Sequence, residues 1–395
     1  MSLPLEGVRV IAVEQYGAGP YGSGHLADMG ADVVKIENRA TGGDTSRGVG
    51  PYFLGDDDSQ FFQTFNRNKR SLTLDLKTEK GQEVLHRLAA TADGLLGNLR
   101  GDQPEKLKLT YEHLRIANPK IVCAHLSAYG RDGSRKGWPG YDFLMQAEAG
   151  FLSLTGEPDN PPARFGLSMV DFMTGAMTVF ALVSGILGAR QTGQGRDVDV
   201  SLYDVAMHQL SYPAVWYLNE GLKTGRVPRS GHPYIVPSQL YRTKDGWIFL
   251  MCQTQRFWEV LCDKLGVPEL ADDVRFRDQA ARHANRDELT GILDEVMTAR
   301  TTEDWLAVLR GFVPCGPVYD LPQALDNPYF RERGGVQTVE HPDRPDLKLM
   351  ESPIRLNEAI PARPAPKLGQ HADDVLRELG YSDEDIRALR DTGVV

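Results

Sequence analysis

Asp171 combines a reactive side chain with an informative position in the sequence. It lies in Ser168-Met-Val-Asp-Phe-Met-Thr-Gly175, directly before a long uncharged stretch that we expect to form a helix. Ser168 and Asp171 have the spacing of a capping box, and an acid in the first turn complements the helix dipole. The same dipole keeps the carboxylate ionised, as a nucleophile requires. The segment therefore fits both a helix cap and a covalent catalyst, and the two roles are compatible.

A glycine-rich turn near the N-terminus indicates a different chemistry. Gly17-x-Gly19-x-x-Gly22 follows a short apolar run, and Glu37 comes twenty residues after Gly17, which formally matches the dinucleotide-binding fingerprint. Against this match, three residues separate the apolar run from the first glycine, and Pro20 lies inside the turn. We favour a glycine-rich βα turn that lets a helix pack closely. An NAD-dependent dehydrogenase stays open as an alternative.

Several common catalytic motifs do not occur in the sequence. It has no HExxH or paired Cys/His ligand spacing, no GxSxG elbow and no GxxxxGK[ST] loop. We therefore expect neither a metal site, nor a hydrolase serine, nor ordinary P-loop phosphoryl transfer. Cys123 lies in an apolar run and is better explained as a core residue than as a nucleophile.

Basic residues cluster in the first part of the chain, and several follow expected strands. Loops at the carboxyl ends of parallel strands form ligand crevices, so these cations fit a phosphate-bearing ligand such as coenzyme A. The residues are Lys35, Arg39, Arg47, Arg67, Lys69, Arg70, Arg100, Arg131, Arg135 and Lys136.

The composition narrows the class of protein. A chain of 395 residues with 41% hydrophobic and 25% charged residues is typical of two or three globular domains. The formal charge of −10 argues against a nucleic-acid-binding face. Four scattered cysteines and an N-terminus without a signal-like apolar run predict a reduced, cytoplasmic protein. Residues 172–189 carry no charge but contain Gly, Ser and Thr, which favours a buried core helix over a membrane span.

Strands and helices are expected to alternate along the first part of the chain, which predicts an α/β protein with a parallel sheet covered by helices. A helix should run from the glycine turn to Met29, and another should cover 81–92. The expected strands are 8–13, 32–37, 71–76, 94–98 and 121–127.

A second domain should follow the Gly- and Pro-rich stretch 221–238. Residues from about 330 to 365 are again Pro-rich, and we expect them to be irregular. Ser382 and Asp385 predict a capped helix near the C-terminus. The other elements expected in this half are a strand at 245–251 and helices at 255–265, 303–310 and 383–390.

Six sequence blocks in this order resemble the family III CoA-transferases, a group that includes the α-methylacyl-CoA racemases, and the resemblance covers nearly the whole chain. The blocks are Leu5-Glu-Gly-Val-Arg-Val10, Ala27-Asp-Met-Gly-Ala-Asp-Val-Val-Lys-Ile-Glu37, Asn68-Lys-Arg-Ser-Leu72, Gly140-Tyr-Asp142, Gly195-Arg-Asp-Val-Asp-Val-Ser-Leu202 and Val375-Leu-Arg-Glu-Leu-Gly-Tyr-Ser382.

The resemblance implies that Asp171 is the nucleophile, because the family's catalytic aspartate lies in a segment similar to 169–175. The racemases have a Gly-His-Asp motif, and Tyr141 stands at the position of that histidine. Two-base proton exchange then lacks one partner, which favours CoA transfer over racemisation. Tyr141 becomes a candidate for positioning the reacting carbonyl. An α-methylacyl-CoA racemase and an inert CoA-binding protein stay open as alternatives.

The resemblance also implies where CoA binds: the first βα loop, the end of the second strand, the Asn-Lys-Arg-Ser segment and the loop near the fourth strand. Two departures argue against formyl or oxalate specificity. Asn38 stands where related transferases often have arginine, and 252–258 replaces the glycine-rich loop of formyl-CoA transferase. The matching positions are Gln15, Tyr16, Asn38, Arg39, Lys69, Arg70, Ser71, Leu72, Asn98 and Arg100.

For the fold, the resemblance implies a large Rossmann-like domain from 1–224 and 326–395 and a smaller α+β domain at 225–325. It further implies an interlocked homodimer of two ring-like subunits. The implied substrates are an acyl-CoA, with succinyl-CoA as a reasonable donor, and a small carboxylic acid. We expect no permanently bound cofactor and neither nucleic acid nor membrane as partner.

Overall fold

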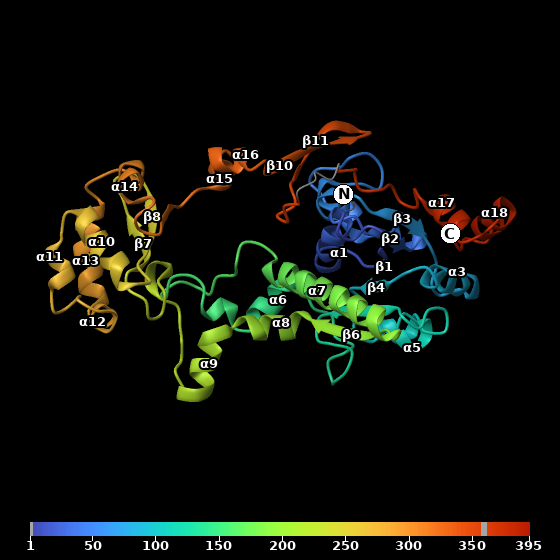
Figure 1. The fold of residues 1–395 in the computed structure, drawn as a ribbon, viewed down its shortest axis with the longest axis horizontal. Helices are drawn as coiled ribbons and strands as arrows, with labels where there is room; N and C mark the ends of the chain where they lie inside the picture. The colour runs from blue at the N-terminus through green and yellow to red at the C-terminus, as the bar shows by residue number, and fades with distance from the viewer. Residues whose placement is uncertain (1–2, 357–361) are drawn as a thin grey trace. The chain divides into compact units, whose positions relative to one another are not determined.

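A six-stranded parallel sheet forms the centre of the first of two units in the chain (Figure 1). The computed structural model describes residues 3–356 and 362–395. The strand order is β3-β2-β1-β4-β5-β6, which confirms the predicted α/β class with a parallel sheet. The edge strand β6 was not among the expected elements. The strands are β1 (Arg9–Val13), β2 (Asp32–Glu37), β3 (Arg70–Thr73), β4 (Gly94–Gly97), β5 (Val122–Ser127) and β6 (Arg196–Ser201).

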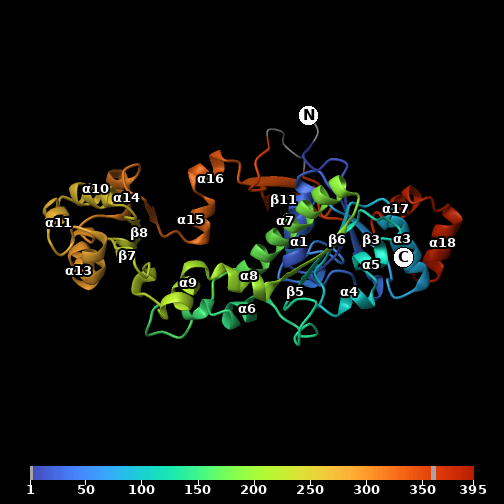
Figure 2. The same ribbon diagram turned by 60° about the horizontal axis from the view of Figure 1, so that its bottom comes forward.

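Helices cover both faces of this sheet, as its almost entirely apolar central strands require (Figures 1 and 2). On one face, α1 (Ala18–Asp28) and α7 (Met169–Thr192) pack on a core that includes Leu26 and Leu182. On the other, α3 (Glu79–Ala89), α17 (Ala372–Glu378) and α18 (Asp383–Asp391) enclose a second core. Cys123 is fully buried there, which confirms its assignment as a core residue.

The long helix α7 is only partly buried, which corrects the expectation of a core helix. One side, with Thr174 and Leu182, faces α1 and the sheet. The other side exposes 68% of Phe180 and 60% of Leu187. Among helices in the described ranges, α7 alone is long and apolar enough to cross a membrane. A single such helix does not indicate a membrane protein, since one side of α7 packs on α1 and the sheet.

The second unit comprises residues 150–165 and 210–330. Its antiparallel sheet, β7 (Ser238–Arg242), β8 (Trp247–Met251) and β9 (Cys315–Pro317), packs on α10 (Gln255–Leu265), α13 (Arg286–Met297) and α14 (Thr302–Leu309). The strand and helices expected at 245–251, 255–265 and 303–310 are therefore confirmed.

The boundaries of this unit differ from the 224/225 and 325/326 expected. Residues 150–165 and 210–224 group with it. The first of these segments is joined to it by Glu157, whose carbonyl accepts from the guanidinium of Arg226 and whose carboxylate accepts from the Arg229 N–H.

A hairpin, β10 (Val336–His341) and β11 (Arg344–Met350), occupies part of the stretch that was expected to be irregular. The alternating pattern of Val339, Leu347 and Leu349 buries one side against Leu54. Residues 357–361 of this stretch lie outside the described part. The remaining helices are α2 (Gln60–Asn66), α4 (Gln103–Lys106), α5 (Tyr111–Leu114), α6 (Asp142–Glu148), α8 (Leu202–Gln209), α9 (Ser211–Glu220), α11 (Glu269–Asp272), α12 (Gln279–Ala284), α15 (Leu321–Leu325) and α16 (Pro328–Glu332).

The chain closes the first unit by returning along the segment around α2 and β3. The Asn68 N–H donates to the carbonyl of Arg363, and the Gly369 N–H donates to the hydroxyl of Ser71. Beyond this return, Ser382 and Asp385 form the predicted capping box at the start of α18.

Candidate active site

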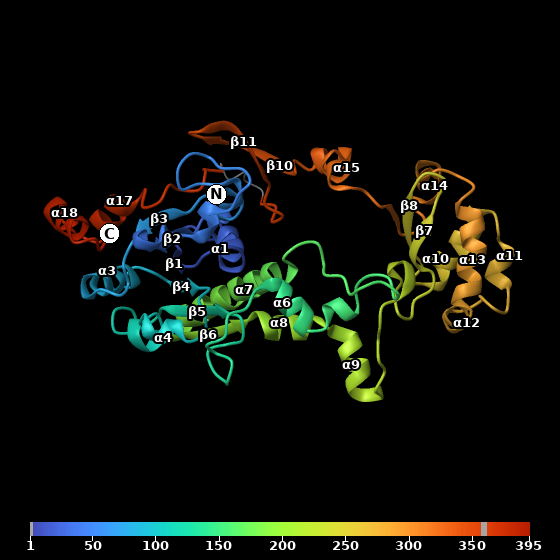
Figure 3. The same cartoon turned by 180° about the vertical axis from the view of Figure 1, so that it is seen from behind.

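Two glycines let α1 and α7 touch along their backbones (Figure 3). A Cβ atom on Gly22 would lie 2.6 Å from the carbonyl oxygen of Gly175, and one on Gly175 would lie 2.3 Å from that of Ala18. A residue with a side chain does not fit at either position. This contact brings the glycine-rich turn to the first turn of α7, where a Cβ on Gly17 would lie 3.0 Å from Oδ2 of Asp171. The glycines thus serve close packing beside the candidate nucleophile.

The Asp171 carboxylate is half-buried at the start of α7, and its surroundings disfavour its charge. Burial, together with the neighbouring charge of Asp142, raises the pKa of Asp171 to about 7. The sequence had led us to expect a carboxylate kept ionised by the helix dipole, which is the opposite direction. No cation in the described residues pairs with Asp171 to reverse this effect.

The predicted capping box of Ser168 and Asp171 is wrong. Ser168 has a ψ angle of 64°, outside the extended range of a typical N-cap, and its side chain makes no capping hydrogen bond. Asp142 supplies the missing acceptor: its Oδ2 accepts the Asp171 N–H at 2.9 Å. Asp142 is 3% exposed, and its Oδ1 accepts from Nε2 of Gln146 at 2.5 Å. The sequence reasoning overlooked Asp142, although it belongs to the Gly140-Tyr-Asp142 block.

Tyr141 directly precedes Asp142 and is the N-cap residue of α6. Its side chain is 68% exposed, so a role in orienting the substrate carbonyl stays a prediction.

The first βα loop is fixed beside the site by Asn98, at the end of β4. The Asn98 amide accepts from the Gln15 N–H at 2.8 Å and donates to the Gln15 carbonyl at 2.7 Å. Gly19 makes room for it, since a Cβ there would lie 2.9 Å from the Asn98 side chain. Tyr16 has φ of 69°, a strained conformation that is enriched at functional sites. The structure therefore brings Gln15, Tyr16 and Asn98 together near Asp171.

A network of buried charges lies behind this loop. Lys69 Nζ is 2.8 Å from the Glu14 carboxylate, and Lys35 Nζ is 2.8 Å from Asp44 Oδ2 and also donates to the Glu14 carbonyl. Burial opposes charge on every member. Burial lowers the pKa of Lys69 to about 8. Burial would raise the pKa of Asp44, but the positive charge of Lys35 and backbone hydrogen bonds outweigh burial and lower that pKa to about 2. Lys69 therefore holds the loop from beneath, and its contact with CoA stays a prediction.

The other predicted CoA-binding residues lie in different places. Arg70 pairs with Asp32 and Glu378 at the amino end of the sheet, which is the far end from Asp171. The Ser71 hydroxyl donates to Glu37, and Leu72 is a core residue. The structure does not bring these three side chains to Asp171, so their contact with CoA stays a prediction.

Three further predicted residues lie at the carboxyl ends of strands, where a CoA phosphate would be accessible to them. Asn38 follows β2, and its side chain accepts from the Ala40 N–H. Arg39 is exposed beside it, and Arg100, after β4, is exposed and paired with Asp102 at 2.6 Å. These guanidinium groups fit an anionic ligand better than the buried Lys69.

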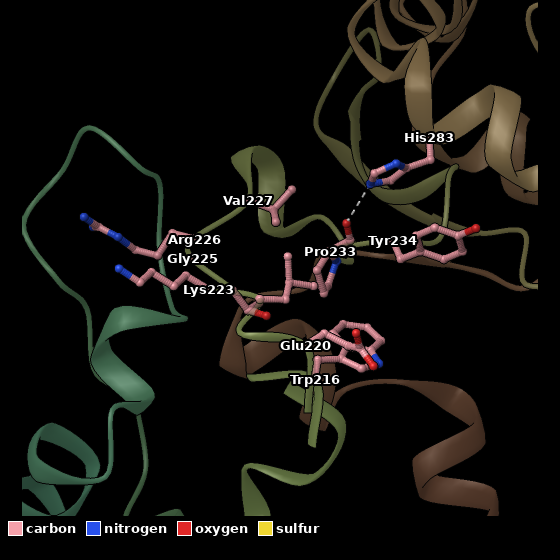
Figure 4. A pocket seen from close by; sticks show the side chains of 11 residues that line it. Trp216, Glu220, Lys223, Gly225, Arg226, Val227, Pro233, Tyr234 and His283 are labelled. Carbon is pink, nitrogen blue, oxygen red and sulfur yellow. Dashed lines mark hydrogen bonds between the residues drawn. The ribbon is translucent and has the colours of Figure 1, made fainter. Parts of the chain in front are cut away.

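A cavity of about 520 Å³ lies within the second unit (Figure 4). Trp216, Val227, Pro233 and Tyr234 give it a mostly apolar lining, and His283 Nε2 lies 3.2 Å from the Pro233 carbonyl oxygen. It contains none of the predicted catalytic or CoA-binding residues. In the described part of the chain, no group of three or more His, Cys, Asp or Glu side chains is arranged to hold a metal.

Comparison with known proteins decides which class of enzyme this chain belongs to. The model of CoA-transferase family III matches residues 5–372. The chain belongs to this family. It is 34% identical to the succinate–glutarate CoA-transferase of Agrobacterium fabrum, over 95% of this chain and 96% of that protein. It is 33% identical to the human succinyl-CoA:glutarate CoA-transferase, over 99% and 90% respectively.

Solved structures agree with the family assignment. A CaiB/BaiF family protein from Brucella suis superposes with a TM-score of 0.81 at 33% identity, covering 96% of this chain and all of that one. A mutant of Rv3272 from Mycobacterium tuberculosis gives a TM-score of 0.84 at 30% identity, covering 95% of this chain and 99% of that one. This family III CoA-transferase is therefore an enzyme that moves CoA from a thioester to a carboxylic acid.

Proposed function

We propose that this CoA-transferase takes CoA from succinyl-CoA or another dicarboxyl-CoA and passes it to a second acid, with Asp171 as the covalent acyl carrier. The observation that carries the proposal is the Asp171 carboxylate at a backbone-lined turn, without a cation partner among the described residues. A buried charge without a cation partner destabilises the fold, so its presence at this turn favours a role in the reaction. An exposed edge and a raised pKa are typical of a group kept for reaction.

The reaction begins when an Asp171 oxygen attacks the thioester carbonyl carbon. The C–S bond breaks, CoA leaves as the thiolate, and a mixed anhydride forms on Asp171. The thiolate then attacks the Asp171 carbonyl carbon, and the donor acid leaves as a carboxylate. An aspartyl-CoA thioester remains.

The acceptor reverses these steps. Its carboxylate attacks the aspartyl thioester and expels the thiolate, which then attacks the acceptor's acyl carbonyl. The products are the new acyl-CoA and a free Asp171 carboxylate. Each intermediate is an activated acyl group, so the half-burial of Asp171 serves to limit attack by water.

The start of α1 supplies the electrostatic support that such steps need. Gly17 is the N-cap of α1 and has no side chain to block approach, and no capping side chain occupies the first N–H groups. Free N–H groups at a helix N-terminus stabilise the negative oxygen of a tetrahedral intermediate. The contact at Gly22 and Gly175 places them beside Asp171.

Several relatives act on dicarboxylates, which supports the substrate class proposed. Another relative is named as a succinyl-CoA:mesaconate CoA-transferase of Haloarcula marismortui. Arg39 and Arg100, both exposed, fit the phosphates of CoA.

We also propose that the enzyme works as an interlocked homodimer in the cytoplasm. The exposed apolar side of α7, with Phe180 and Leu187, supports a partner chain at that face. Light scattering after size-exclusion chromatography checks the assembly: a dimer mass is expected, and a stable monomer would contradict it.

Trapping of the covalent intermediate tests the proposal. Enzyme incubated with succinyl-CoA and quenched with hydroxylamine or borohydride should carry a modification on the peptide that contains Asp171, and Asp171→Asn should not. A panel of other acyl-CoA donors read by mass spectrometry then defines the substrate. Exchange of the α-proton for deuterium in D₂O without acyl transfer would instead identify a racemase.

A further inference from the structure

The first turn of α7 receives its cap from another helix. The N–H groups that begin a helix need acceptors, and Ser168 does not provide one. The Asp142 carboxylate, in the first turn of α6, accepts the N–H of Asp171 itself at 2.9 Å. The hydrogen bond therefore fixes the backbone of the reacting residue rather than that of a neighbour.

Asp142 is held rigidly enough to act as such an anchor. It is 3% exposed, and Gln146, one turn later on α6, donates to its second oxygen at 2.5 Å. Gln146 is itself fully buried. Both Asp142 oxygens are thus engaged, one by its own helix and one by α7, so a shift of α6 would move Asp171.

The negative charge of Asp142 also acts on the Asp171 side chain. Two carboxylates in one buried place disfavour each other's ionised forms. After burial, Asp142 is the cause of the raised pKa of Asp171, and it is the one charged group that acts on Asp171 within the described residues.

The other acids on elements packed against α7 have partners of their own, and neither Arg196 on β6 nor His208 on α8 acts on the charge of Asp171. The partners of these acids are Arg67 for Asp28, Arg135 for Glu148, the ring of His125 for Asp197, Arg131 for Asp199 and Ser201 for Asp204. His25, on α1, responds to Asp28, Arg67 and Lys69, and Arg190, near the end of α7, pairs with Asp93.

We propose that Asp142 is a positioning residue for acyl transfer: it anchors the backbone of Asp171 by capping α7, and its negative charge makes the Asp171 carboxylate a stronger nucleophile. A more basic carboxylate attacks a thioester faster once it is ionised, but it is ionised over a narrower range of pH. Asp142 thus lowers the activity at low pH and raises the reaction rate above neutrality. This inference rests on the proposed role of Asp171.

Asp142→Asn removes the charge and keeps an oxygen that accepts the Asp171 N–H, while its NH₂ group faces Gln146, which must turn its own amide oxygen toward it. We expect the acid limb of the kcat/KM profile to move down by roughly one pH unit, the scale of a like-charge effect. The variant should be more active than wild type below about pH 6 and roughly two- to fivefold less active above about pH 8. Glu148→Gln, which removes an exposed acid from the same helix, should leave the profile unchanged.

Asp142→Ala removes the cap as well and should lower kcat at every pH in addition to moving the limb. A uniform loss of activity in Asp142→Asn with no shift of the limb would overturn the proposal. Circular dichroism checks that each variant folds.

A direct titration tests the proposal without depending on the activity of the variants. In wild-type enzyme with ¹³C-labelled aspartate, the resonance that Asp171→Asn abolishes should titrate near pH 7 and move to lower pH in Asp142→Asn. Titration of Asp171 near its ordinary value in wild type would overturn the inference. If the resonance behaves as expected but no covalent intermediate forms, the proposed function fails while the coupling of the two acids stands.

Discussion

Two sets of acidic residues lie near the carboxyl ends of the central strands, and their surroundings are opposite. Glu14 and Asp44 are buried against Lys69 and Lys35, and the pKa of Asp44 is lowered to about 2. Asp171 faces another acid, and its pKa is raised to about 7. Paired buried acids hold the first βα loop in place, whereas the unpaired one is free to react. Pairing with a cation thus separates Glu14 and Asp44 from Asp171, while the buried Asp142 is held by hydrogen bonds instead.

Removal of the reactive acid should have the largest effect. Asp171→Asn keeps the shape of the side chain but deletes the nucleophile, and we expect the transfer rate to fall by at least about 10⁴-fold. Steady-state assays with a dicarboxyl-CoA donor measure the loss. Residual activity near wild type would show that another residue is the nucleophile and that the lack of a cation partner does not mark the reactive acid.

Breaking a pair in the structural set should damage stability rather than chemistry. Lys69→Met leaves Glu14 without its nearest cation and should lower the free energy of unfolding by about 3–5 kcal/mol, as for other broken buried ion pairs. Urea unfolding measures this change. Lys80→Met is the matched control: Lys80 is exposed and pairs with the exposed Glu83, so its loss should be within about 0.5 kcal/mol. Equal effects of the two changes would show that the buried pairs do not support the fold.

The contact between α1 and α7, which brings the glycine-rich turn to Asp171, can be perturbed at Gly175. Gly175→Ala would place a Cβ 2.3 Å from the Ala18 carbonyl oxygen, so α1 and α7 must separate. We expect a loss of about 1–3 kcal/mol in stability and a fall in kcat, because Asp171 moves with α7. Gly188→Ala, on the same helix with no atom within 4 Å of the new Cβ, should be neutral or slightly stabilising. An unchanged kcat in Gly175→Ala would show that this helix contact does not affect acyl transfer.

Ionisation of Asp171 should also reduce the stability of the fold as pH rises, an effect that we do not expect from the paired acids. Its pKa is about 7 in the fold against an ordinary value of 3.8, so the folded state holds an extra proton between these limits. Wild-type stability should fall as pH rises through that window. Asp171→Asn should therefore be more stable by on the order of 2 kcal/mol above about pH 7, with no difference near pH 4. Thermal melts across this range check the trend, and a constant difference would contradict the raised pKa.

Much of the sheet could be predicted from sequence, because each central strand is a short apolar run next to a turn or helix signal. Val10 to Val13 and Val122 to Leu126 are such runs, and both are central strands. The edge strand β6 was missed, since Arg196, Asp197 and Asp199 give it a polar pattern. The hairpin at 336–350 was missed because its prolines indicated irregular structure.

The site was harder to predict, because its critical contacts join residues that are distant in sequence. Asp171 was identified, but its cap comes from Asp142 on another helix, which local spacing does not reveal. The resemblance places Lys69 among the CoA-binding residues, and only the fold shows that its side chain is buried against Glu14. Spacing correctly indicated that Gly17 and Gly22 serve close packing, but not that Gly22 would lie against Gly175 and Gly17 against Asp171.

Transfer of oxygen to the enzyme tests the central claim most directly. Wild-type enzyme turned over with succinyl-CoA and an acceptor acid labelled with ¹⁸O in its carboxylate should acquire ¹⁸O in the side chain of Asp171. The attack of the acceptor on the aspartyl thioester leaves one of its oxygens there. Peptide mass spectrometry should locate the label at that residue. An unlabelled Asp171 after many turnovers, with ¹⁸O passed directly into the released succinate, would contradict covalent catalysis by this carboxylate.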